Sequence, residues 1–377
     1  MKLQNRLADI EDDHVVRLVD GWYSIEEDGY QRPTPVLHYH GRGMDGEYRH
    51  FTIDDFRPYF LVAESDLDDD TADALVADRR VIGIERADRA GVDSGETEVE
   101  LIKVIVECPW HVRQLRDEFR RTWEGDIRFE QRFLIDQGIT SLVKIPTETT
   151  ALSAEDVTAA DVNDVDSPEL RVATWDIEVY ADDGLPSTKH TRQPITGVAL
   201  HDSYTDKMTM YALESDADGW DDISVDADLE TYESERELLT AVKQWFLEHS
   251  VDVLVGWNND AFDVPYFVNR CLELGLYDIR FADIGGVDED GIDPNGRFIN
   301  GDVHGVHVFD LLAAYKKSQY TELKSHGLED VAAAETDLEK LDVDEQVAWE
   351  TDPQRFCEYN IRDVAATVAI NDEVQLL

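Results

Sequence analysis

The chain has 377 residues and a formal net charge of −50, from 84 acidic and 34 basic side chains. This length allows two or three domains with apolar cores, and an apolar content of 42% with 8 Trp, 14 Tyr and 13 Phe argues against disorder. No stretch approaches 18 consecutive apolar residues and the amino-terminal segment has no apolar run, so we expect a cytoplasmic protein without a signal peptide or membrane span.

The cysteines are few and widely spaced: Cys108, Cys271 and Cys357. This pattern excludes a disulfide framework or a cysteine zinc site and is typical of a reducing compartment.

The acidic excess has two interpretations. It is either a surface for a basic partner or an adaptation to molar salt, in which the Debye length falls to about 3 Å and self-repulsion is screened. The acids are scattered along the whole chain, and Lys supplies only ten of the 34 basic residues. This distribution favours salt adaptation and a haloarchaeal source, and it makes the charge uninformative about the substrate.

The first part of the chain has mainly strand patterns. Residues 15–65 alternate apolar and polar runs, residues 100–108 read as a further strand, and residues 112–123 have helical spacing. The stretch 146–170 carries Pro, Thr and Asp but few large apolar residues. We therefore expect a β-rich amino-terminal domain over 1–145 and a linker over 146–170.

The second part, 171–377, begins with three strand-like runs that predict an antiparallel meander, RVATWDIEVY, PITGVALHD and KMTMYAL. Ser234 and Glu237 form a capping box at the start of an amphipathic helix. A short strand (251–257), a helix opening near Pro265, a Gly- and Asp-rich loop or hairpin (283–306) and a final helix follow. This order predicts a ribonuclease-H-like α/β domain.

Three segments of this domain place acids in apolar surroundings. Asp176 and Glu178 share one face of a strand, Asp263 precedes a helix, and Asp363 follows Tyr359 by one helical turn. Singly, each has an ordinary explanation: a solvated strand face, a helix cap, or chance in a chain so rich in acids. Together they offer what two divalent metals need to act on a phosphodiester, and ligands that are all carboxylates favour Mg²⁺ or Mn²⁺ over zinc.

The contexts of these acids resemble one family. WDIEVY is similar to the first exonuclease motif of family B DNA polymerases, GWNNDAFD to the second, and YNIRD to the third. Such centres are called DEDDy, after four acids and a tyrosine. The segment FRPYFLVAES and the regions 107–139 and 306–334 also resemble archaeal members, so the likeness covers most of the chain.

The resemblance implies a proofreading 3′→5′ exonuclease that releases nucleoside monophosphates from DNA. It implies that Asp176, Glu178 and Asp363 bind the tighter of two metals, that Asp176 bridges to the second, and that Asp263 contacts it largely through water. Tyr359 would then orient the attacking water.

Two further groups of residues are assigned by the same resemblance. Asn258 and Phe262 would hold a single-stranded or frayed 3′ end, although Phe262 is equally compatible with a core position. Archaeal relatives read template uracil in an amino-terminal pocket, and the matching positions here are Pro58, Pro109, Val112 and Phe129. The alternative is that these four residues simply pack a β-rich core.

The sequence departs from the family in one respect, because no polymerase motif is found in it. Three interpretations follow: a fragment or split subunit, a free-standing exonuclease, or a catalytically idle module that binds template or single-stranded DNA. A split subunit would have a separately encoded palm, fingers and thumb as partner, together with a sliding clamp.

Overall fold

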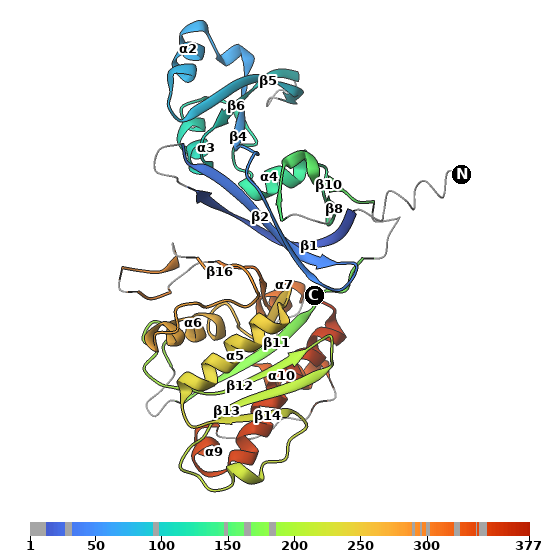
Figure 1. Cartoon of the computed structure of the whole chain (residues 1–377), viewed down its shortest axis with the longest axis vertical. Coiled ribbons are helices and arrows are strands. Elements are labelled where there is room, and N and C mark those ends of the chain that lie inside the picture. Colours follow the sequence, from blue (N-terminus) through green and yellow to red (C-terminus); the bar gives the residue numbers. More distant parts are fainter. Residues whose placement is uncertain are drawn as a thin grey trace, which may run out of the picture. The chain divides into compact units, whose positions relative to one another are not determined.

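A computed structural model describes residues 13–26, 32–92, 98–146, 150–161, 167–180, 186–288, 291–294, 296–298, 302–319, 325–336, 338 and 345–377. The chain forms two compact units, Met1–Pro168 and Glu169–Leu377 (Figure 1). Among the described residues, no helix combines the length and the apolar character needed to cross a bilayer.

The first unit contains two sheets, each with its own helices. The strand order is β10-β8-β1-β2-β3-β9 in the larger sheet and β5-β6-β4-β7 in the smaller. Apolar side chains of the larger sheet pack against α4, and those of the smaller sheet pack against α2 and α3. The β-rich amino-terminal region expected from the sequence is therefore confirmed. The elements are β1 (Asp13–Glu26), β2 (Thr34–Gly43), β3 (Tyr48–Ile53), β4 (Tyr59–Ala63), α2 (Asp69–Ala77), β5 (Val81–Val92), β6 (Glu98–Val106), α3 (Pro109–Arg116), β7 (Thr122–Trp123), α4 (Phe129–Asp136), β8 (Leu142–Pro146), β9 (Ala151–Leu152) and β10 (Thr158–Ala159).

The helix expected over 112–123 is shorter than its spacing predicts. Helix α3 ends at Arg116, and Trp123 instead pairs with Leu61 at the edge of the smaller sheet. The indole of Trp123 also lies over Gly91, where a Cβ atom would come within 3.0 Å of it. A strand edge and a packing site formed by distant residues thus outweigh the local helical pattern.

The middle of the expected linker (146–170) contains two short strands where the sequence predicts a connection without regular structure. Strand β9 pairs with β3, and β10 pairs with β8, so residues 151–159 extend the larger sheet of the first unit. Residues 147–149 and 162–166 lie outside the described residues. The expected domain bounds themselves stay a prediction.

The second unit is built on a mixed six-stranded sheet with the order β14-β13-β12-β11-β15-β18. Strands β11, β12 and β13 form the antiparallel meander predicted from the sequence, while β15 and β18 run parallel to β11. The elements are β11 (Val172–Val179), β12 (Ile195–Asp202), β13 (Lys207–Leu213), β14 (Asp228–Tyr232), α5 (Glu235–His249), β15 (Val253–Gly256), α6 (Asp263–Glu273), β16 (Gly286–Val287), β17 (Val303–His304), β18 (His307–Asp310), α7 (Leu311–Ser318), α8 (Leu328–Glu335), α9 (Glu345–Thr351) and α10 (Pro353–Val374).

Helices cover both faces of this sheet. Trp175 and Ile177 of β11 belong to the large apolar cluster that includes residues of α5 and α6. Ala199 and Met210, on β12 and β13, pack with Phe356 of α10 on the other face. The ribonuclease-H-like fold expected from the sequence is confirmed, with α10 and α5 both visible against the strands in Figure 1.

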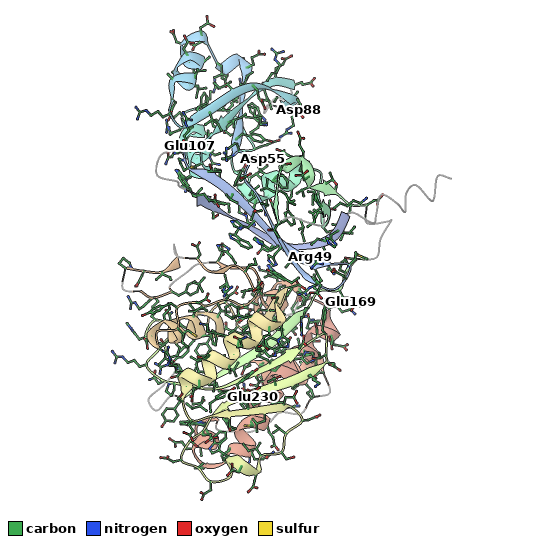
Figure 2. All side chains as sticks on the ribbon, viewed as in Figure 1. Arg49, Asp55, Asp88, Glu107, Glu169 and Glu230 are labelled. Carbon is green, nitrogen blue, oxygen red and sulfur yellow. The ribbon has the colours of Figure 1, made fainter. Side chains whose placement is uncertain are left out.

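The acidic residues are spread over the surface of each unit. Figure 2 shows Asp55 and Asp88 at separate places on the first unit and Glu230 on the second. All three are exposed. Both interpretations of the acidic excess, salt adaptation and a basic partner, stay predictions.

Candidate active site

The first two acids of the predicted centre lie on β11, the central strand of the second unit. Because side chains alternate along a strand, Trp175 and Ile177 enter the core while Asp176 and Glu178 point to the opposite face. Both carboxylates are half-buried. The D-x-E pair is therefore directed to the face of the sheet that α10 covers.

The register places these acids beyond the end of a neighbouring strand. The last residue of β11 paired with β15 is Thr174, opposite Val255, so Asp176 and Glu178 project past the carboxyl end of β15. Asp310 ends the next parallel strand, β18, opposite Gly256. Open α/β sheets commonly bind ligands at such carboxyl ends.

Helix α10 brings the third acid and the phenol to the same face. The helix begins at Pro353 after the capping residue Asp352, whose carboxylate accepts a hydrogen bond from a first-turn N–H. Tyr359 and Asp363 lie one turn apart on its buried side, each with 9% exposure. Carboxylate oxygens of Asp176, Glu178 and Asp363 all lie within 4.8 Å of one another.

These three acids fit divalent cations. Carboxylates held this close repel one another unless a proton or a cation lies between them. They supply only hard oxygen donors, which suit Mg²⁺ or Mn²⁺. They also come from two rigid elements, a central strand and a 22-residue helix, so their separation is maintained by the fold.

Asp263 approaches the same strand from the start of α6. It is 3% exposed, and its Oδ1 accepts a hydrogen bond of 3.3 Å from the backbone N–H of Ile177. Burial raises the pKa of the Asp263 carboxyl to about 7, against the lowering effect of the Ile177 N–H, and the nearby charge of Asp310 adds to the increase. Asp263 is thus next to the centre but outside the close group of three.

The structure adds one site residue that sequence reasoning missed. The Nδ2 atom of Asn360 donates a 2.8 Å hydrogen bond to Oδ2 of Asp176. Asn360 is fully buried, and its Oδ1 has no hydrogen-bond partner among the described residues. The available signal was a polar residue directly after Tyr359 on the buried side of the last helix. Its contact with β11, distant in the chain, could not be read from the sequence.

The residues expected to hold DNA lie in the turn before α6. Asn258 is exposed and has a positive φ of 68°. Phe262 is half-buried, packs against the core and lies 5.5 Å from the ring of Tyr266. The neighbouring Asn259 is structural, since it accepts a hydrogen bond from the indole N–H of Trp175 and donates one to the carbonyl of Leu254. A role of Asn258 and Phe262 in DNA binding stays a prediction.

The four residues of the expected uracil pocket are all in the first unit. Val112 packs in the apolar cluster of the smaller sheet, whereas Phe129 packs in that of the larger sheet and stacks on Phe56 at 5.7 Å. The carbonyl of Pro58 accepts the N–H of Val106, and Pro109 begins α3. The two apolar side chains thus belong to separate clusters, and both the pocket and the core-packing alternative stay predictions.

Comparisons with known proteins found similar sequences among archaeal and phage DNA polymerases. DNA polymerase 1 of Sulfolobus acidocaldarius is 23% identical over 349 residues, which are 83% of this chain and 38% of that protein. The DNA-directed DNA polymerase of Enterobacteria phage T4 is 31% identical over 254 residues, or 59% of this chain and 28% of the phage protein. The solved family B DNA polymerase from the hyperthermophilic archaeon Pyrobaculum calidifontis shares the fold over 96% of this chain and 46% of that chain, with a TM-score of 0.73 and 20% identity.

The chain therefore spans less than half the length of each of these relatives. Residues 120–331, more than half of the chain, match the family model described as DNA polymerase family B, exonuclease domain. This range contains Asp176, Glu178 and Asp263, while Tyr359 and Asp363 lie beyond it. The chain belongs to DNA polymerase family B and carries that family's exonuclease domain.

Proposed function

We propose that this chain is a metal-dependent 3′→5′ exonuclease that removes the terminal nucleotide from DNA as a nucleoside monophosphate. The observation that carries the proposal is the close group of Asp176, Glu178 and Asp363, with ligand atoms within 4.8 Å and Tyr359 one helical turn from Asp363. The family match supports a nuclease acting on DNA.

Each residue has a distinct task in this proposal. Asp176, Glu178 and Asp363 would hold the Mg²⁺ or Mn²⁺ ions, with Asp263 as a further acid beside them. Bound ions of this kind supply charge that stabilises both the attacking and the leaving oxygen of the phosphodiester. The Tyr359 hydroxyl would orient the attacking water by a hydrogen bond. Asn360 positions Asp176 by holding one of its oxygens.

The substrate in this proposal is a single-stranded or frayed 3′ end. Asn258 and Phe262 lie in the turn that leads into Asp263, and we assign this turn to contact with the DNA strand. Phe262 is only partly buried, which leaves part of its ring available for stacking on a base. We propose that the activity edits ends made by a polymerase domain of the same family acting on the same strand.

An oligonucleotide assay tests the activity and its direction. A single-stranded DNA labelled at its 5′ end is incubated with the purified chain in molar KCl, with Mg²⁺ or with a chelator. We expect a ladder that shortens from the 3′ end, nucleoside monophosphate as product, and no shortening in the chelator. Asp176→Asn should slow the reaction by at least about 100-fold, because removing a ligand is more damaging than removing an outer partner.

The matched control is Asp228→Asn, which removes an exposed acid from β14 of the same sheet and should retain full activity. The alternative, an idle DNA-binding module, predicts that the labelled strand is bound but not shortened. Shortening by Asp176→Asn at the wild-type rate would contradict the assignment of the site.

A further inference from the structure

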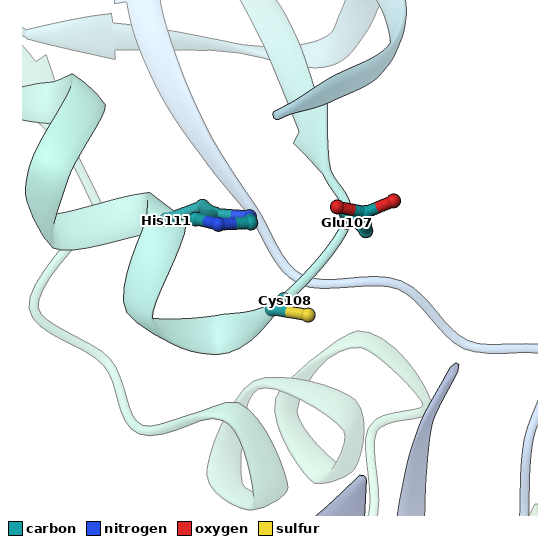
Figure 3. Close-up of side chains that lie close together, drawn as sticks. All are labelled: Glu107, Cys108 and His111. Atoms are coloured by element: carbon teal, nitrogen blue, oxygen red, sulfur yellow. The ribbon is translucent and has the colours of Figure 1, made fainter. Parts of the chain in front are cut away.

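A second group of metal-ligating side chains lies in the first unit, apart from the exonuclease acids. Glu107 follows β6, Cys108 precedes α3, and His111 lies in the first turn of that helix. One ligand atom from each residue lies within 4.8 Å of the others. Figure 3 shows the imidazole of His111 pointing toward Glu107, with the thiol of Cys108 beside them.

The backbone fixes the positions of these three residues. The N–H of Glu107 donates to the carbonyl of Arg80 at 2.9 Å, and the N–H of His111 donates to the carbonyl of Cys108 at 3.0 Å. The group therefore sits on a hydrogen-bonded junction between a strand and a helix. His111 is thus held on the helix, while Glu107 and Cys108 lie in the two-residue connection that these hydrogen bonds anchor.

Burial leaves ligand atoms in this group that water does not reach. Cys108 is fully buried. The Nδ1 atom of His111 is also buried and has no hydrogen-bond partner within the described part of the chain. A buried imidazole nitrogen without a partner is costly, and coordination of a metal ion would satisfy it.

The neighbouring charges do not block the group. Arg80, near His111, is engaged by Asp78 at 2.7 Å and by Glu118 at 3.2 Å. Arg32 lies 3.7 Å from the Glu107 carboxylate, but its side chain is 60% exposed. Such an exposed ion pair contributes little and can be exchanged for a stronger ligand interaction.

We propose that Glu107, Cys108 and His111 bind one Zn²⁺ ion, with water in the fourth position. Zinc takes thiolate, imidazole and carboxylate ligands at about 2.0–2.3 Å in a tetrahedron, which places ligand atoms roughly 3.3–3.8 Å apart. Because the ligand atoms already lie within 4.8 Å of one another, side-chain movements of at most about 1 Å would close the site. On binding, the Cys108 thiol releases its proton to solvent as the sulfur–zinc bond forms.

This site differs in chemistry from the exonuclease centre, which offers only oxygen ligands. It also qualifies the expectation from the sequence that sparse cysteines exclude a cysteine zinc site. That argument holds for sites built from several cysteines. The Cys-x-x-His spacing of Cys108 and His111 needs only one, with Glu107 completing the set.

Cobalt binding to the full chain tests the proposal, because a cobalt–thiolate bond gives a charge-transfer absorption that carboxylate sites lack. The protein is freed of metal with a chelator, titrated with Co²⁺, and then with Zn²⁺. We expect one thiolate-bound Co²⁺ per chain, displaced by Zn²⁺. Cys108→Ser should abolish the band, and His111→Gln and Glu107→Gln should each weaken Co²⁺ binding by at least about tenfold.

The control is Cys357→Ser on α10, where burial raises the pKa of the thiol to about 12. This variant should keep the band. A wild-type chain without a thiolate band, or a band that persists in Cys108→Ser, would overturn the proposal. If circular dichroism shows that Cys108→Ser does not fold, the Co²⁺ affinities of His111→Gln and Glu107→Gln test the site instead. Wild-type Co²⁺ affinity in both of these variants would reject the proposal.

Discussion

Gly197→Ala tests how tightly helix α10 must pack on the sheet to form the site. Gly197 lies on β12 opposite Glu178 in the strand register. A Cβ atom at this position would come within 2.9 Å of Phe356 Cζ, 3.0 Å of Met210 Cε and 3.2 Å of Asn360 Oδ1. Two of these three atoms belong to α10, so the added methyl group pushes directly on the helix that carries Tyr359 and Asp363.

The expected magnitude follows from these distances. Ordinary contact begins at 3.4 Å, so Phe356, which is 1% exposed in a close-packed interior, must retreat by about half an ångström. Overpacking of this kind costs about 1–3 kcal/mol of unfolding free energy. A 1 Å misplacement of catalytic groups can cost about 100-fold in rate, so half that shift predicts a loss of about tenfold.

Two measurements on one variant check this prediction: urea unfolding and single-turnover release of the 3′ nucleotide. The control is Gly83→Ala, where the new Cβ would meet only Ile105, at an ordinary 3.5 Å. We expect the control to match the wild type in rate and to change stability by less than about 1 kcal/mol. Wild-type stability and rate in Gly197→Ala would refute the reasoning, and lost stability with a wild-type rate would refute the link between helix position and catalysis.

Three other predictions concern individual side chains. Tyr359→Phe removes the hydroxyl proposed to orient water and should slow nucleotide release by about 100-fold, with unchanged DNA binding in a fluorescence anisotropy titration. Asn360→Leu loses the hydrogen bond to Asp176 but also removes a buried oxygen that has no partner among the described residues. The unfolding free energy should therefore change by less than about 1 kcal/mol, while the rate falls about tenfold. An unchanged rate would show that Asn360 does not position Asp176. Burial raises the pKa of Asp202, but hydrogen bonds and charge from Arg171 outweigh it and hold that pKa below the ordinary 3.8. The Arg171–Asp202 pair therefore stabilises the folded state at pH values above 3.8, the ordinary pKa of Asp in the unfolded chain. This stabilisation is lost as the pH falls through the lower pKa that Asp202 has in the folded state. Asp202→Asn should cost about 1.5–3 kcal/mol in urea unfolding at neutral pH, and a difference from the wild type that persists at the lowest pH would contradict this assignment.

Much of the exonuclease fold was predictable because its local patterns are strong. The alternation around Trp175 and Asp176 correctly separates core from site, and the capping box at Ser234 marks the start of α5. The final helix expected from the sequence is also present, as α10. In these places the local pattern and the tertiary packing favour the same structure, so the sequence alone suffices.

Other features depend on contacts between distant segments and were therefore missed. Trp123 has helical spacing with its neighbours, yet it forms a strand because β4 offers an unpaired edge and Gly91 leaves room for the indole. The hydrogen bond from Asn360 to Asp176 joins residues 184 positions apart. The charge of Asp310 beside Asp263 likewise follows from the pairing of β18 with β15.

The exonuclease assignment is tested most directly by two substitutions on one helix. Asp363→Asn and Asp372→Asn each remove one negative charge from α10, but Asp363 is buried in the site whereas Asp372 is exposed. Single-turnover release of the 3′ nucleotide is measured for both with Mg²⁺ in molar KCl, after circular dichroism shows that both fold. We predict a loss of at least about 100-fold for Asp363→Asn and a wild-type rate for Asp372→Asn; equal rates in the two variants would contradict the proposed site.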